Sequence, residues 1–254
     1  MPLIFNDDDK LGTLAYGSRS NYVAAEIREL IVSGILIPRE HLRIDEVAEF
    51  FKVSATPVRE ALHLLHAEGL IDRSAGSGFR VHPLTGQDIE DIFLAHSFVA
   101  GELAARAVPN ITADDMRELR AINHDTLALI ERDQLNRLNE VNMGFHQLIN
   151  RAANSPRLKW LTSFYLKYMP QRRYGLISRW PEITANSQKN LIAALHDSDV
   201  DAARTAAENN VLNAGRALAM HFSEKVRDSQ QNSEDDAEDP TSSAGGGGDE
   251  NTIR

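Results

Sequence analysis

Apolar residues recur at the spacing of an α-helix along almost the whole chain between Val23 and Phe222. Alternation typical of β-strands is confined to Leu70–Arg73 and Phe79–His82, which flank the small residues of Ala75–Gly78. Two short strands around a glycine-rich tip indicate a β-hairpin. The sequence therefore predicts a mainly α-helical protein with one hairpin.

The region Gly17–Pro83 combines that hairpin with three helices. Apolar residues at i, i+4, i+7 and i+8 from Val23 mark the first helix. A shorter helix is predicted over Asp45–Phe51, and the third runs from about Thr56 to Gly69, with Pro57 in a first turn that tolerates proline. Three helices followed by a hairpin form a winged helix-turn-helix domain.

The region 84–222 is helical throughout and shows no competing strand pattern. Prolines near the ends of segments, and a capping pattern at Thr112 and Asp115, mark helix boundaries. We expect an all-α bundle with helices near 87–107, 112–132, 136–153, 156–169, 181–196 and 199–222.

The two ends of the chain have no amphipathic pattern. Residues 1–16 are expected to form a flexible arm, without the basic start and apolar core of a signal peptide. Residues 223–254 are expected to form a disordered acidic tail, because they bury too little apolar surface to offset the entropy of ordering. The chain has no cysteine and no apolar run long enough for a transmembrane helix, so we expect a cytoplasmic protein without a membrane partner.

The net charge of the chain is −10, which argues against a general attraction to nucleic acid. The tail at 223–254 carries nine acidic and three basic residues, whereas Gly17–Pro83 is nearly neutral, with nine acidic and eight basic residues. Any DNA binding must therefore depend on a few well-placed cations.

The segment Lys52–Leu62 carries the strongest functional pattern in the chain. A capped helix after a tight turn presents free N–H groups, so Ser54 and Thr56 suit phosphate contacts and Arg59 suits a guanine in the major groove. The alternative is that the two hydroxyls only cap the helix and Arg59 only contacts solvent. The downstream hairpin favours DNA binding, and the predicted DNA-binding residues are Lys52, Ser54, Ala55, Thr56, Arg59, Gly76, Ser77, Gly78 and Arg80.

This region resembles the GntR family of bacterial regulators. The resemblance rests on Gly34, Pro38, Val47–Glu49, Val53-Ser54, Thr56–Leu62, Leu65, Glu68–Ile71 and the glycine-rich wing. It implies a homodimer that binds a palindromic operator in double-stranded DNA, with one recognition helix and one wing in each half-site.

The chain departs from the family pattern at two positions. Arg39 stands where the family usually has glycine, and Ala55 stands where it usually has arginine. The second departure removes one expected DNA contact and can change the preferred operator.

The helical region resembles the FCD ligand-binding domain of FadR-like GntR proteins. Typical members bind a divalent metal through an Asp-x-x-x-His motif, a Glu-His pair and a later histidine. At these positions the chain has Asn142 and His146, then Ser187-Gln188, then Asn210. One imidazole and three neutral amides supply no negative charge, so we expect no metal cofactor; if an ion does bind, His146 is a ligand.

Helical spacing places these four polar residues on apolar or small-residue stripes, which indicates a polar pocket in the bundle. We expect the amides to bind an organic effector directly; alternatively, they only satisfy one another in the core. The resemblance adds His96, as an effector contact or as a core histidine. It also adds Arg172, Arg173 and Arg179, which can hold a carboxylate or phosphate or lie in a solvated loop. Helical spacing predicts core positions, rather than an effector stack, for Trp160, Phe164, Tyr165 and Tyr168.

Together these patterns predict a sequence-specific DNA-binding transcriptional regulator, preferably a repressor, controlled by a small organic effector such as a carboxylic acid or an acyl-CoA. Enzyme activity is not expected, because the chain has no Gly-x-Ser-x-Gly elbow and no glycine-rich phosphate loop after a strand. Two alternatives stay open. One is a metal-dependent sensor of carboxylic acids, and the other is a regulator that senses no small molecule and binds a partner through its acidic tail.

Overall fold

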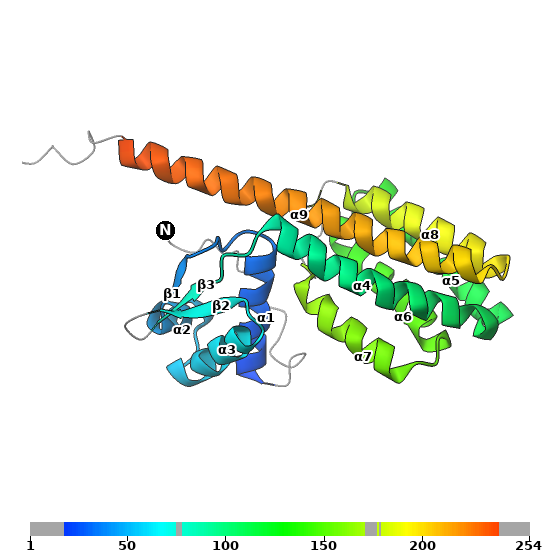
Figure 1. Ribbon diagram of the computed structural model, residues 1–254, viewed down its shortest axis with the longest axis horizontal. Helices are drawn as coiled ribbons and strands as arrows, with labels where there is room; N and C mark the ends of the chain where they lie inside the picture. The colour runs from blue at the N-terminus through cyan, green and yellow to red at the C-terminus, as the bar shows by residue number, and fades with distance from the viewer. Residues whose placement is uncertain (1–17, 75–77, 171–176, 178, 239–254) are drawn as a thin grey trace, which may run out of the picture.

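The computed structural model describes residues 18–74, 78–170, 177 and 179–238. In these residues a small winged helix is followed by a helical bundle, and the last helix runs past both (Figure 1). The mainly α fold predicted from the sequence, with its winged helix-turn-helix and all-α bundle, is confirmed. None of the helices in the described ranges is both long and apolar enough to cross a membrane.

The winged helix contains three helices and a three-stranded antiparallel sheet. Its elements are α1 (Arg19–Val32), β1 (His41–Leu42), α2 (Ile44–Phe51), α3 (Ala55–Ala67), β2 (Ile71–Ser74) and β3 (Gly78–Val81). Strand β3 lies between β1 and β2 and pairs with both. Strand β1 was not predicted, because two residues are too few to show an alternating pattern.

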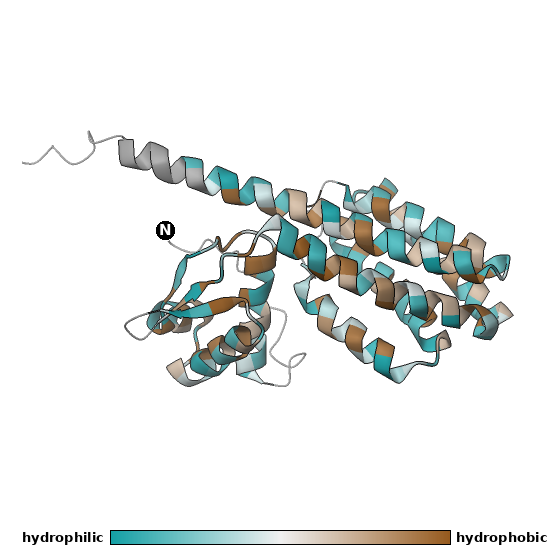
Figure 2. Cartoon of the chain, in the orientation of Figure 1, coloured by the Kyte–Doolittle hydropathy of each residue, from teal (hydrophilic) through white to brown (hydrophobic). Residues whose placement is uncertain are grey.

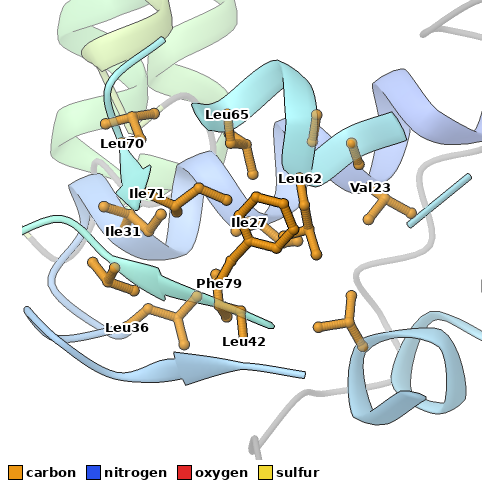
Figure 3. Close-up of a cluster of buried hydrophobic side chains, with 14 of the residues drawn as sticks. Val23, Ile27, Ile31, Leu36, Leu42, Leu62, Leu65, Leu70, Ile71 and Phe79 are labelled. Carbon is orange, nitrogen blue, oxygen red and sulfur yellow. The ribbon is translucent and has the colours of Figure 1, made fainter. Parts of the chain in front are cut away.

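Buried apolar side chains from the helices and the sheet form one core in this domain (Figure 3). Phe79 of β3 points between Ile27 of α1 and Leu62 of α3. Side chains alternate across a strand, so Phe79 and Val81 are buried while Arg80 between them is exposed. The core thus fixes which residues of the hairpin face outward.

The bundle contains the six helices expected from the sequence and two short 3-10 helices. They are α4 (Gly86–Ala107), η3 (Val108–Asn110), α5 (Ala113–Glu131), α6 (Leu135–Ala152), α7 (Pro156–Tyr165), η4 (Leu166–Tyr168), α8 (Trp180–His196) and α9 (Val200–Glu238). Reciprocal capping boxes start α4 at Thr85 with Asp88 and α5 at Thr112 with Asp115.

Helices α4 and α9 lie side by side along the bundle (Figure 1). Glycines permit their close approach. A Cβ atom at Gly215 of α9 would lie 2.6 Å from Cγ of Phe93, and one at Gly101 of α4 would lie 2.6 Å from Cγ of Glu208. Phe93 itself is buried in the bundle core, so it has little room to move.

Helix α9 continues to Glu238, although disorder was expected from Ser223 onward. The expectation of disorder was wrong for residues 223–238. It considered the polar composition of this segment but not that the segment continues a packed helix without a helix-breaking residue. No glycine or proline interrupts the chain between Gly215 and Pro240, so the helix can propagate from its packed part into a mostly hydrophilic segment (Figure 2). The segment also gains contacts, since a Cβ atom at Gly34 would lie 3.0 Å from Cβ of Lys225. The predicted arm and residues 239–254 lie outside the described residues.

We expect Gly215→Ala to destabilise the protein by about 1–3 kcal/mol, because the added methyl group overpacks the contact with Phe93. The melting temperature should fall by roughly 2–4 °C for each kcal/mol lost. Gly144→Ala in α6 is the matched control, since a Cβ atom there meets nothing within 4 Å. Thermal unfolding followed by circular dichroism measures both; equal melting temperatures for the two variants would contradict the packing argument.

Candidate functional site

The start of α3 has the geometry expected of a recognition helix. Lys52 ends α2 in the left-handed region, with φ of 53°, and so turns the chain sharply toward α3. Ser54 is the N-cap of α3, but its hydroxyl accepts no capping hydrogen bond. The first N–H groups of α3 therefore lack a side-chain cap, which leaves them suited to a phosphate oxygen.

Arg59 lies one turn into α3 and is exposed, whereas the adjacent Val58 is buried. It borders a broad open groove between α2, α3 and the sheet. Four further basic side chains line the same groove, namely His41, Arg43, His63 and Arg73. None of these four was predicted from the sequence, because they come from different elements and follow no motif. Three of the eight lysine and arginine residues in the nearly neutral domain, Arg43, Arg59 and Arg73, thus line one groove.

The other predicted DNA-binding residues lie around this surface. Lys52, Ser54, Thr56 and Arg80 are exposed, while Ala55 and Gly78 are half-buried. Gly76 and Ser77 lie outside the described residues.

A cavity of about 110 Å³ lies in the bundle, between α4, α6, α8, α9 and the segment that runs from α7 through η4. Four of the predicted effector-binding residues line it together, namely His96, Asn142, His146 and Asn210. The side-chain amide nitrogen of Asn210 lies 3.4 Å from Nε2 of His146, as for an N–H donated to an unprotonated ring nitrogen. Four polar residues that were not predicted also line it: Asn139, Gln147, Asn150 and Thr162.

Gln188 lies behind the cavity wall and does not line it. Its Oε1 accepts a hydrogen bond from Nδ2 of Asn123 at 3.2 Å, and its Nε2 donates one to Oδ1 of Asn142 at 3.2 Å. Gln188 therefore orients Asn142 from behind the cavity wall. Arg179 is exposed and faces Glu182, with 3.7 Å between Nε and Oε2. Arg172 and Arg173 lie outside the described residues.

Burial keeps both histidines of the cavity neutral. Burial, with a smaller contribution from the nearby His146, lowers the pKa of His96 to about 4. Burial also lowers the pKa of His146 to about 4. At neutral pH the two rings therefore carry no charge.

The residues of the cavity do not fit a divalent metal ion. The positions that resemble the family's metal site hold one imidazole and three neutral amides, and Oδ1 of Asn142 already accepts a hydrogen bond from Gln188. Among the described residues, no group of three or more histidine, aspartate or glutamate side chains could hold an ion.

Two protein-family models together cover most of the chain. The model described as "Bacterial regulatory proteins, gntR family" matches residues 19–81, and that of the FCD domain matches residues 91–213. The HTH-type transcriptional repressor RspR of Escherichia coli (strain K12) is 30% identical over 215 residues, which cover 82% of this chain and 89% of that protein. The chain belongs to the GntR family. It is thus a DNA-binding transcriptional regulator with an FCD domain, in a family of regulators and not of enzymes.

Other relatives of this GntR-family chain agree. The uncharacterized HTH-type transcriptional regulator BphR of Paraburkholderia xenovorans (strain LB400) is 29% identical over 181 residues, 68% of this chain and 72% of that protein. Among solved structures, the E. coli McbR/YncC structure superposes with a TM-score of 0.60 at 22% identity, over 81% of this chain and 99% of that one. The superposition supports the fold.

The two domains of the GntR-family chain meet at Glu68, the residue that ends α3. One carboxylate oxygen of Glu68 accepts hydrogen bonds from Nε and Nη2 of Arg28 at 2.8 and 2.7 Å, and the other accepts one from Nζ of Lys167 at 2.9 Å. Tyr168 packs against the winged-helix core and donates its hydroxyl to the backbone oxygen of Glu68 at 3.1 Å. No sequence signal pointed to this contact, because its partners are about a hundred residues apart.

The aromatic residues of α7 and η4 do not form one core stripe. Trp160 and Phe164 are 64% and 43% exposed, so the prediction that they lie in the core was wrong. Their periodicity is helical, but the outer face of α7 has no described element to cover it. Tyr165 stacks on His96 with ring centroids 5.2 Å apart, and Tyr168 reaches the other domain.

Proposed function

We propose that this GntR-family regulator is a cytoplasmic homodimeric repressor of a palindromic operator, controlled by a small organic effector in the cavity of the helical bundle. The repressor name of the E. coli relative supports the direction of regulation. The single observation that carries the proposal is the η4 segment, which lines the cavity on one side and binds the end of the recognition helix on the other.

DNA binding in this proposal uses the exposed start of α3. Arg59 reads a base edge in the major groove, and Ser54 and Thr56 contact phosphates. Arg43, Arg73 and the wing then hold the flanking backbone. Because only a few cations act, their placement determines the register of the protein on the operator.

Effector control in this proposal passes through η4. Leu166 and Met169 line the cavity, whereas Lys167 and Tyr168 between them bind Glu68 at the end of α3. An effector that favours one position of this short segment also favours one position of the recognition helix. Regulation then requires only that the effector binds one arrangement of η4 and the recognition helix more tightly than another.

Dimerisation in this proposal uses the outer surface of α4 and α9. Phe98 and Met220 are 61% and 59% exposed, and Leu94, one turn from Phe98 on α4, is 45% exposed. Acidic Glu90 and Asp91 of α4 line one shallow groove together with basic Arg216 of α9. Exposed apolar side chains interspersed with charges of both signs suit a self-complementary interface, so we assign this surface to a second copy of the chain.

Arg59→Ala should weaken binding to an operator fragment, selected from random duplexes by the wild-type protein, by about 1–3 kcal/mol. That corresponds to roughly 5- to 150-fold in Kd, with most of the loss at a guanine–cytosine position. Gel shifts with the operator and with unrelated DNA measure the change. Arg120→Ala, an exposed residue of α5, is the control. A wild-type affinity for Arg59→Ala would refute the proposed base contact.

Tyr168→Phe removes one hydrogen bond to Glu68 but keeps the ring in the winged-helix core. We expect operator affinity to change by about 2- to 10-fold, as for one hydrogen bond of about 0.5–1.5 kcal/mol. Fluorescence anisotropy with the labelled operator measures it, and Lys159→Ala on the exposed side of α7 is the control. Should Tyr168→Phe and Lys167→Ala both bind like the wild type, η4 does not control the recognition helix.

Phe98→Glu should weaken the dimer at least about 30-fold, since a central aromatic residue of an interface typically contributes 2 kcal/mol or more. Sedimentation velocity at low micromolar concentration should then detect monomer. Trp160→Glu introduces the same charge at an exposed aromatic residue of α7 and should leave the dimer intact. The assignment fails if Phe98→Glu stays dimeric or if the two variants dissociate alike.

A further inference from the structure

We propose that the cavity of the helical bundle binds a small uncharged ligand of about one ring in size, with an amide-like donor and acceptor, and that it does so without a metal ion. The inference rests on the proposed function and names the chemical class of its effector. The family resemblance had left carboxylic acids and acyl-CoA thioesters open.

The described residues that line the cavity carry no formal charge. Among the described residues that line it there is no aspartate, glutamate, lysine or arginine. Alanine, leucine, valine and isoleucine side chains form much of the rest. Transfer of an ionised carboxylate into such a site costs several kcal/mol unless a cation or several donors compensate it. An uncharged ligand avoids that cost.

The polar atoms of the cavity offer both donors and acceptors in fixed positions. Gln188 holds Oδ1 of Asn142, so the amide N–H groups of Asn142 are left to donate to a ligand. Asn210 uses its amide nitrogen toward His146, so its Oδ1 is left to accept. A carboxamide or lactam matches such a pair, whereas a carboxylate has no N–H to donate.

The two histidines strengthen this complementarity. The depressed pKa values of His96 and His146 leave both rings uncharged at neutral pH, so either ring would have to take up a proton before it could neutralise an anion. The contact of His146 with Asn210 places the ring proton of His146 on Nδ1. The stacking of His96 on Tyr165 fixes its ring plane at the cavity wall.

The size of the cavity limits the ligand further. A cavity of about 150 Å³ in another protein holds benzene, so the present volume of about 110 Å³ accommodates a molecule of about that size. The enclosed part therefore takes a single ring or a short chain and not a whole acyl-CoA thioester.

Matched neutral and anionic compounds test the ligand class on the full chain. Benzamide with benzoate, and nicotinamide with nicotinate, share a skeleton and differ in charge. At millimolar concentrations we expect at least one of the amides to raise the melting temperature by about 2 °C or more, because a ligand that binds the native state stabilises it. The carboxylates and zinc chloride should have no such effect. The proposal is overturned if a carboxylate matches or exceeds its amide, if one equivalent of zinc binds per chain, or if neither amide stabilises.

Asn142→Asp tests the site with an isosteric change that keeps the acceptor for Gln188. It should weaken binding of the stabilising amide at least about 10-fold in calorimetry, because it replaces the donating N–H group by a charged acceptor. Asn213→Ala, exposed one turn along α9 from Asn210, is the control. Wild-type amide affinity in Asn142→Asp would overturn the site. An amide that binds this site but leaves operator affinity unchanged would instead reject effector control and leave the ligand class standing.

Discussion

Helices α4 and α9 approach each other closely because glycines stand where side chains would collide. Gly215 receives the ring of Phe93, and Gly101 leaves room for Glu208. Helix α4 leads directly out of the wing, and α9 continues past it to the turn at Gly34 of the winged helix. The same helix pair forms one wall of the cavity and joins the bundle to the DNA-binding domain.

Glu68 forms the second contact between the two domains, with Lys167 and Tyr168 of η4. Its side chain is 15% exposed and binds two cations, Arg28 and Lys167, so the carboxylate stays paired with one cation if the other is lost. Lys167 and Tyr168 supply this contact from a 3-10 helix whose neighbours line the cavity. Adjacent residues of this short segment contact the cavity and Glu68, which is why the segment suits coupling between the two sites.

Amide side chains stand at positions of the FCD cavity where typical family members have metal-coordinating carboxylate or histidine side chains. This difference changes which ligands the cavity suits. One imidazole and three neutral amides do not suit a divalent ion, but they can present hydrogen-bond donors and acceptors in a low-dielectric wall. Gln188 shows how this arrangement is held, because it uses both ends of its amide to orient Asn142. Gln188 thus supports the cavity wall through hydrogen bonds from behind and does not line the cavity itself.

The sequence by itself determined the element types, the winged helix and the bundle, because helical spacing and capping are local properties of the chain. It also placed Asn142, His146 and Asn210 near one another, since their faces follow from helical periodicity and from the family resemblance. Only the tertiary structure decided that Gln188 lies behind the cavity, that Arg43 and Arg73 join Arg59, and that Tyr168 reaches Glu68. These contacts join residues far apart in the chain, and no local pattern encodes which exposed side chain of one element meets another.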